Sequence, residues 1–226
     1  MPRVLFRILQ FLTALVGTFI GLSLFLVLLW RFVPVPVTMT MAMDENGYTK
    51  DWQGLDDIDR SMVRAVIASE DQNFCEHDGF DYAAIQAAME HNMKGGKQRG
   101  GSTISQQTAK NVFLWQGGGF VRKGLEAWFT VLIENLWTKR RIMEVYLNVA
   151  ETGIGTYGAQ AGSLRYFGHG ADRLSNSEAA RMAVALPSPK KREVKNPQGW
   201  LRRHGDRMAR AVDTMAREGL DACVYE

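Results

Sequence analysis

One apolar segment near the amino terminus constrains this chain more than any other feature. From Ile8 to Trp30 the sequence runs for 23 residues without a charge. About 20 helical residues cross the hydrocarbon core of a bilayer, so this segment is long enough to span one. A cleaved signal peptide has a shorter apolar core and an A-x-A-like site, and no such site follows Trp30. We therefore expect residues 1–33 to be a cytoplasmic tip and an uncleaved transmembrane anchor.

The charges that flank this anchor predict its orientation. Arg3 and Arg7 precede the span, and the positive-inside rule holds them in the cytoplasm. Arg31 follows the span, which weakens the asymmetry without reversing it. We therefore expect a single-pass protein of the cell inner membrane, with residues 34–226 as one periplasmic domain.

The body of the chain is neutral, and it contains few cysteines. The three arginines of the first 33 residues account for the net charge of +3, because 24 bases and 24 acids remain. A neutral body argues against a general nucleic-acid binder. Two cysteines are too few for a disulfide framework or a four-cysteine zinc site. Cys75 and Cys223 could pair in an oxidising compartment, and only their geometry can decide that.

Hydrophobic spacing predicts a mainly α fold of helices separated by glycine-rich loops. Ser, Thr or Asp caps mark most of the expected helix starts. One expected helix begins at Asp56 or Asp57, and a second runs from Asp81 to Gly95-Gly96. A third covers 103–114 with a Thr103/Gln106 capping box, and a long helical stretch runs from Val121 to Tyr146 with a break near Thr138. The last two run from a Ser175/Glu178 capping box to Pro187 and over 199–217. A short hairpin near 38–53 is the one strand pair expected.

Glu70 is the first candidate for chemistry. It follows Ile67 by three residues and Val66 by four, so it shares the apolar face of its helix and lies in the last turn. Burial and the helix macrodipole both raise the pKa of a carboxyl there, which suits a group that takes a proton near neutral pH. The alternative is a glutamate that caps a neighbour or pairs with a buried base. For His77 we expect a supporting hydrogen bond, because no second His or Cys stands at metal-ligand spacing.

The second candidate is a strongly basic window. It holds six basic residues and no acid: Lys94, Lys97, Arg99, Lys110, Arg122 and Lys123. Gly100–Thr103 feeds a helix amino terminus, where free N–H groups attract anions. Thr103, Gln106, Gln107 and Lys110 form a polar stripe on that helix. These features fit a phosphate site without a Walker motif, and the alternative is a solvated basic loop.

The third candidate is Glu126, which follows Arg122 by four residues and Lys123 by three. The simplest interpretation is an ion pair on the surface of a helix. The alternative is an acid beside a diphosphate, where it binds a divalent cation or steers a lysine. Mg²⁺ commonly takes only one or two protein carboxylates together with phosphate oxygens, so one Glu is enough.

Five collinear blocks of sequence carry a family resemblance. They are Glu70-Asp-Gln-Asn-Phe74 with His77 and Gly79, Gly101-Ser-Thr-Ile-Ser-Gln-Gln-Thr-Ala-Lys-Asn111, Arg122-Lys-Gly-Leu-Glu126, Arg141-Ile-Met-Glu-Val-Tyr-Leu-Asn148, and Tyr157-Gly with Tyr166-Phe-Gly168. Together with the anchor, they resemble the monofunctional peptidoglycan glycosyltransferases of glycosyltransferase family 51, which polymerise lipid II. The resemblance covers about residues 35–215, and we expect the form without a transpeptidase domain.

The resemblance implies a lysozyme-like, two-lobed helical fold with a cleft between the lobes. Glu70 would be the general base that deprotonates the 4-hydroxyl of lipid II, which attacks C1 of the lipid-linked chain with inversion and releases undecaprenyl diphosphate. Asp71, Phe74 and His77 would shape the surroundings of the base. Glu126 would act at the leaving diphosphate, together with Mg²⁺ or another divalent cation. The residues that would hold sugar and diphosphate groups are Ser102, Thr103, Gln107, Lys110, Arg122 and Lys123.

Two departures from the family pattern stand out. Where members often have an Arg before Arg122-Lys123, this chain has Gln116-Gly-Gly-Gly119, with Gly118 at the position in question. One phosphate contact is therefore missing, or Lys97 or Arg99 supplies it. The frequent Glu after Tyr-Gly is Gln160 here, which we interpret as structural.

Other interpretations of the chain stay open from the sequence. A lytic transglycosylase or muramidase also uses a Glu in such a cleft, although it needs no diphosphate site. An inactive membrane-anchored scaffold for cell-wall or division proteins is the second alternative, and division proteins or cell-wall synthases are candidate partners of either form. The run from Lys190 to Arg210 holds eight bases against Glu193 and Asp206, which predicts a solvated helix or contact with anionic lipid headgroups.

Overall fold

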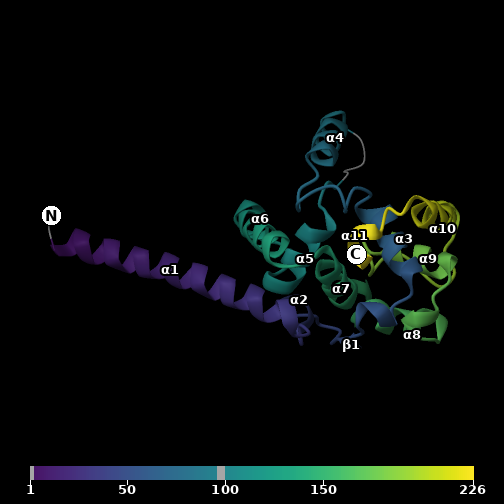
Figure 1. Ribbon diagram of the computed structural model, residues 1–226, viewed down its shortest axis with the longest axis horizontal. Coiled ribbons are helices and arrows are strands. Elements are labelled where there is room, and N and C mark those ends of the chain that lie inside the picture. The colour runs from purple at the N-terminus through teal and green to yellow at the C-terminus, as the bar shows by residue number, and fades with distance from the viewer. Residues whose placement is uncertain (1–2, 96–99) are drawn as a thin grey trace.

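The protein is a helical body from which one long helix extends (Figure 1). The computed structural model describes residues 3–95 and 100–226, so the phosphate contacts expected from Lys97 or Arg99 lie outside the described residues. The elements in chain order are α1 (Arg3–Phe32), α2 (Met39–Ala42), β1 (Thr49–Lys50), η1 (Leu55–Asp57), α3 (Arg60–Glu70), α4 (Tyr82–Met93), α5 (Ile104–Phe113), α6 (Gly119–Leu136), α7 (Lys139–Val149), β2 (Glu151–Gly153), β3 (Thr156–Tyr157), α8 (Ala159–Phe167), η2 (Ala171–Arg173), α9 (Asn176–Ala185), α10 (Gly199–Glu218) and α11 (Ala222–Tyr225). The mainly α class expected from the sequence is confirmed.

Two packed groups of helices make up the body. In one group α3 packs against α9 and α10, and in the other α5 packs against α6 and α7. The alanines of α9 allow close approach to α3, whose Val63, Val66 and Ile67 are fully buried. Helix α4 projects from the top of the body in Figure 1. Glu70, the last residue of α3, contacts Gln107 of α5 where the two groups adjoin.

Most of the helix starts predicted from capping residues are confirmed. The side chain of Asp81 accepts a hydrogen bond from the backbone N–H of Ala84 at the start of α4. The capping boxes at Thr103 and Ser175 are both present, and Thr138 caps α7 at the predicted break. These caps form because each satisfies backbone donors that lack a partner in the first turn of a helix.

Two local predictions are wrong. Asp56 and Asp57 do not begin α3, because they lie in the single turn of η1 and Asp59 caps the helix by accepting from Ser61. The hairpin near 38–53 is also absent from the described residues. The side chain of Thr38 caps α2 instead, and β1 pairs in parallel with the distant β3 in a sheet of order β1-β3-β2.

The first half of the basic run at the carboxyl end, from Lys190 to Lys195, lies in the loop between α9 and α10, whereas its second half lies in the amphipathic helix α10. Its Val212 and Met215 are buried, whereas its arginines are mostly exposed. In Figure 1 this helix lies at the end of the body opposite the free part of α1. The exposed arginines of α10 fit a solvated helix, while Lys190 at the start of the run pairs with Asp44 after α2, and contact of the run with lipid headgroups stays a prediction.

A disulfide joins Cys75 to Cys223, with their Cα atoms 5.6 Å apart. It ties the loop after α3 to α11, across 148 residues of chain. The pairing that the sequence left open is therefore present, and it fixes the back of the loop that carries Asp71 and His77.

We expect the double variant Cys75→Ala/Cys223→Ala to lose about 2–5 kcal/mol of unfolding free energy, because the cross-link closes a long loop in the unfolded chain. Urea unfolding in detergent, with and without reductant, measures the loss. Reductant should destabilise the wild type and leave the double variant unchanged. An unfolding midpoint of the wild type that ignores reductant would contradict a stabilising disulfide.

Candidate active site

A cleft of about 590 Å³ opens where the two groups of helices adjoin. Glu70 and Asp71 line it from the end of α3, and Gln107 and Lys110 line it from α5. Gly101 closes one wall tightly, because a Cβ there would lie 3.2 Å from the Cα of Ile85. Most of the predicted site residues are thus brought to one cavity.

Glu70 lies half-buried in this cleft at the end of a hydrogen-bonded relay. The amide Nε2 of Gln107 donates to Glu70 Oε2 at 2.9 Å, and the hydroxyl of Tyr146 donates to Gln107 Oε1 at 3.3 Å. Burial raises the pKa of Glu70 above its ordinary value, while the Gln107 hydrogen bond and the charges of Arg192 and Lys110 lower it. The group is therefore fixed in direction and suited to accept a proton.

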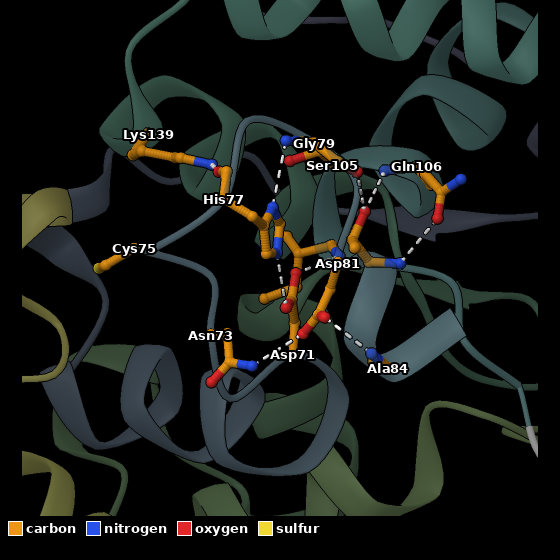
Figure 2. Close-up of polar contacts among 12 residues, drawn as sticks. Asp71, Asn73, Cys75, His77, Gly79, Asp81, Ala84, Ser105, Gln106 and Lys139 are labelled. Atoms are coloured by element: carbon orange, nitrogen blue, oxygen red, sulfur yellow. Dashed lines mark hydrogen bonds and ion pairs between the residues drawn. The ribbon is translucent and has the colours of Figure 1, made fainter. Parts of the chain in front are cut away.

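Asp71 holds two elements in place, the start of α5 and the loop that follows α3. Figure 2 shows its contact with His77 in that loop. Its Oδ2 accepts from the backbone N–H of Ile104 at 2.9 Å, and its Oδ1 lies 2.9 Å from Nε2 of His77. The backbone N–H of Gly79 donates to Nδ1 of His77, so the imidazole proton is on Nε2 and points at Asp71. His77 therefore has the supporting role expected from the sequence.

The loop between α3 and α4 is fixed from behind. Phe74 is fully buried, and the ammonium of Lys139 lies 4.6 Å from the centre of its ring. Lys139 also donates to the backbone oxygen of His77 at 2.6 Å (Figure 2). Asn73 donates to Asp81 at 2.8 Å. The ring of Phe74 therefore supports the loop and is not part of the cleft lining, and its influence on the surroundings of Glu70 stays a prediction.

Thr103 also has a structural task. Its hydroxyl donates to the backbone oxygen of Gly79 at 2.7 Å and accepts from the N–H of Gln106 as the cap of α5. The side chain is buried and its O–H is already donated, so this hydroxyl could only accept a further hydrogen bond, and its role in substrate binding stays a prediction. Of the polar stripe on α5, Thr103, Gln107 and Lys110 line the cleft.

A cationic cluster of Lys110, Arg122 and Lys123 stands around the buried carboxylate of Glu126. Arg122 Nη1 lies 2.6 Å from Glu126 Oε2, and Lys123 Nζ pairs with Oε1. Lys123 also donates to the hydroxyl of Ser102 at 3.1 Å. Burial lowers the pKa of Lys110, and the charges of Arg122 and Lys123 lower it further. Three cations against one carboxylate favour an anion such as a diphosphate.

The same contacts do not fit a divalent cation on Glu126. Both carboxylate oxygens pair with cations, so a divalent cation on Glu126 would lie directly beside the positive charges of Arg122 and Lys123. Glu126 is therefore described better as the anchor of Arg122 and Lys123.

The glycine loop before α6 does not accommodate a side chain at Gly118. This residue has a φ of +89°, and a Cβ would lie 2.9 Å from the Cβ of Arg122. An Arg, like any L-residue, would therefore be strained at this position in the loop conformation of this chain. Gln160 is structural as expected, because its Oε1 accepts from the N–H of Ala171.

Two contributors to the site had no clear sequence signal. Tyr146 lies among apolar residues of α7, so spacing indicates a core residue and conceals its hydrogen bond to Gln107. Arg192 comes from the loop after α9, far along the chain from Glu70, yet its charge lowers the pKa of that carboxyl.

Comparison with known proteins adds independent findings. Residues 38–216 match the family model described as transglycosylase. The chain is 51% identical over 201 residues to the biosynthetic peptidoglycan transglycosylase of Caulobacter vibrioides, covering 88% of each chain. It is 50% identical over 193 residues to that of Pseudomonas aeruginosa, covering 81% of this chain and 83% of the relative. It is 45% identical over 213 residues to that of Rhodospirillum centenum, covering 91% and 92%.

We expect Glu70→Gln to raise the free energy of unfolding at neutral pH by about 1 kcal/mol, as removal of a strained functional group often does. Because burial raises the pKa of folded Glu70, ionising it opposes folding, and the neutral amide avoids that cost. The gain should disappear as the pH falls below 4.5, where Glu70 is protonated in both states. Urea unfolding in detergent across this pH range measures it.

Glu76→Gln is the matched control, because Glu76 is exposed and nearby. In this control variant the free energy of unfolding should not rise at neutral pH in the way expected for Glu70→Gln. A Glu70→Gln variant that is less stable than the wild type at neutral pH would contradict the unfavourable environment inferred for Glu70.

Proposed function

Because the chain belongs to the transglycosylase family and is a peptidoglycan glycosyltransferase, we propose that it extends glycan strands by transferring a lipid-linked chain onto the 4-hydroxyl of lipid II. The observation that carries this proposal is one cleft lined by Glu70, a candidate proton acceptor, and by Lys110 of the cationic cluster, with Lys123 bonded to Ser102 in its wall. A transfer that releases a diphosphate needs both.

The proposed reaction is a single displacement with inversion. The carboxylate oxygen of Glu70 that does not bond to Gln107 takes the proton of the acceptor 4-hydroxyl. As it does so, the hydroxyl oxygen forms a bond to C1 of the donor sugar. The bond between C1 and the diphosphate oxygen breaks, and its electron pair leaves with the diphosphate. Glu70 then returns the proton to water. Gln107 keeps the carboxylate pointed into the cleft through its hydrogen bond to Oε2.

The cationic cluster is proposed to stabilise the leaving group. Lys110 lies close enough to Glu70 for the two charges to influence each other's pKa. Arg122 and Lys123 are held in place by Glu126, so they need little rearrangement when charge develops on the diphosphate. Their contacts should strengthen as the bond to C1 breaks.

The cationic cluster also distinguishes an enzyme that polymerises glycan strands from one that cleaves them. A lytic transglycosylase or muramidase uses a carboxyl group but releases no diphosphate, so it has no need for three cations beside its acid. The charge of the cleft therefore favours polymerisation over cleavage and over an inactive scaffold.

We propose that α1 anchors the enzyme in the cell inner membrane, with its amino terminus in the cytoplasm and residues 34–226 in the periplasm. The length and apolar composition of α1 support a single span. The Cys75–Cys223 disulfide supports an oxidising compartment for the domain. Cell-wall synthases or division proteins are the partners that such an enzyme would meet there.

We expect Glu70→Gln to lower the polymerisation rate by about 10²–10⁴-fold, because the amide cannot accept the hydroxyl proton. Incubating purified full-length protein with lipid II and measuring polymer length tests this, and binding of lipid II should persist in the variant. Incubation with preformed glycan strands is the second arm. Fragmentation of those strands by the wild type, or normal polymerisation by the variant, would refute the proposal.

Lys110→Ala should lower kcat/KM for lipid II by about 10- to 100-fold, the size of one charge-assisted contact. Lys94→Ala is the matched control, because Lys94 belongs to the same basic window but is exposed at the end of α4. Equal kinetics in the two variants would restore the interpretation of a solvated basic loop.

Chelation of divalent cations should change the polymerisation rate little, because Arg122 and Lys123 already neutralise the carboxylate of Glu126 and would repel Mg²⁺. Rates measured with EDTA, then after Mg²⁺ is added back, test this. A strong Mg²⁺ requirement that Glu126→Gln abolishes would instead support Glu126 as a metal ligand.

A further inference from the structure

The chain leaves α1 through residues 30–36, which we call the exit segment, and side chains of the body hold this segment. Nε and Nη2 of Arg141, near the start of α7, donate to the backbone oxygen of Trp30 at 3.1 and 2.8 Å. Nη2 also donates to the backbone oxygen of Val33 at 2.7 Å. Backbone oxygens at the carboxyl end of a helix lack partners within it, and a cation is favoured there. Arg141 therefore caps the end of α1 from another helix.

The prolines of the exit segment explain why this end needs a cap from outside. In an α-helix the oxygen of Trp30 would accept from the N–H four residues on, and Pro34 has no N–H. A guanidinium presents several donors in one plane, so a single Arg can serve the oxygens of both Trp30 and Val33. Pro36 restricts the backbone further along. The exit segment is thus stiff, and it is bonded to the body.

A second cation holds the rest of the exit segment. Nζ of Lys50 donates to the backbone oxygen of Val35, and to that of Pro36 at 3.0 Å. The ring of Trp52 supports both cations, because Lys50 Nζ lies 5.1 Å and the guanidinium carbon of Arg141 5.4 Å from its centre. We call Arg141, Lys50 and Trp52 the clamp. It binds four backbone oxygens of the exit segment.

The helix that carries Arg141 also directs Glu70. Tyr146, five residues further along α7, donates to Gln107, which in turn donates to Glu70. At 1.5 Å per residue, Arg141 and Tyr146 are about 8 Å apart along the helix. One short helix therefore fixes both the end of the anchor and the direction of the proposed base.

The packing of α1 against α6 does not replace the clamp. The indole N–H of Trp137 donates to the backbone oxygen of Val27 at 2.8 Å, and the rings of Phe19 and Trp128 lie 6.0 Å apart. These contacts fix the line along which α1 passes the body, before its free part extends away (Figure 1). The clamp fixes the turn from α1 into the domain. Its loss should therefore loosen the joint without releasing the anchor.

We propose that Arg141 is a positioning residue, which holds the cleft at a fixed height and tilt above the bilayer by clamping the exit segment. The inference rests on the proposed function and anchoring, because both substrates are then lipid-linked. Their sugars are tethered to the same membrane as the enzyme, so the height of the cleft decides whether the acceptor hydroxyl reaches Glu70. A misplacement of reacting groups by about 1 Å can cost about 10²-fold in rate.

Pulsed electron paramagnetic resonance on the full chain measures the joint directly. Spin labels are placed on Leu15→Cys of α1 and Leu164→Cys of α8, which are exposed and line neither the clamp nor the cleft, with the native disulfide kept intact. In vesicles of phosphatidylethanolamine and phosphatidylglycerol, Arg141→Ala should broaden the distance distribution severalfold. Arg140→Ala is the matched control, because its guanidinium pairs with the exposed Asp56 and should leave the distribution unchanged. An unchanged distribution in Arg141→Ala would overturn the proposal.

Kinetics separate positioning from folding. In vesicles, Arg141→Ala should lower kcat for lipid II by about 10-fold, with KM changed little, because the cleft is misplaced relative to tethered substrates. In detergent micelles, where enzyme and lipid II orient freely, the rate should stay close to that of the wild type. Arg140→Ala should match the wild type in both media.

Arg141→Lys is the second variant, because Arg141 also pairs with Glu144 and the alanine leaves that carboxylate without its partner. The lysine keeps a charge there but lacks the fork that serves two oxygens, so it should lower the rate in vesicles and not in micelles. An equal loss in both media, or no loss in vesicles, would overturn the proposal. A wild type that makes no polymer in either medium would refute the proposed function, and the distance distributions would still test the clamp.

Discussion

The two carboxylate oxygens of Asp71 hold together the parts that form the cleft. One faces His77 in the loop after α3, and the other accepts from the backbone of Ile104 at the start of α5. Leaving such a buried acceptor without its donor costs about 1–3 kcal/mol, so both elements keep their places. Glu70, the preceding residue, is thereby directed at Gln107 one turn along α5. The direction of Glu70, the proposed proton acceptor, thus depends on the side chain of its neighbour Asp71.

Local signals in the sequence predicted the helices well, whereas the pairing of strands far apart in the sequence could not be predicted. Asp81, Thr103 and Ser175 cap their helices as expected, because a cap satisfies backbone donors only two or three residues away. The predicted hairpin failed because the partner of β1 is β3, which no pattern near residue 50 could indicate. Asp59, and not Asp56 or Asp57, caps α3 because the backbone turns through η1 before that helix begins.

Residue type identified the chemical groups of the site, whereas their division of labour required the fold. Glu70 stood out because it shares the apolar face of its helix, and Lys110 and Arg122 because they belong to a basic window that holds no acid. Thr103 and Phe74 belong to the same blocks, yet their atoms are used to close a helix end and to support a loop. Arg192 escaped notice because only tertiary folding brings its loop towards Glu70.

The bond between Cys75 and Cys223 has a consequence for the order of biogenesis. The two cysteines lie 148 residues apart in the sequence, so Cys75 has no partner until the segment between them has been synthesised. Until then the loop behind Glu70 lacks its covalent cross-link. Nascent molecules that end before Cys223 therefore fold without the bond that ties this loop to α11.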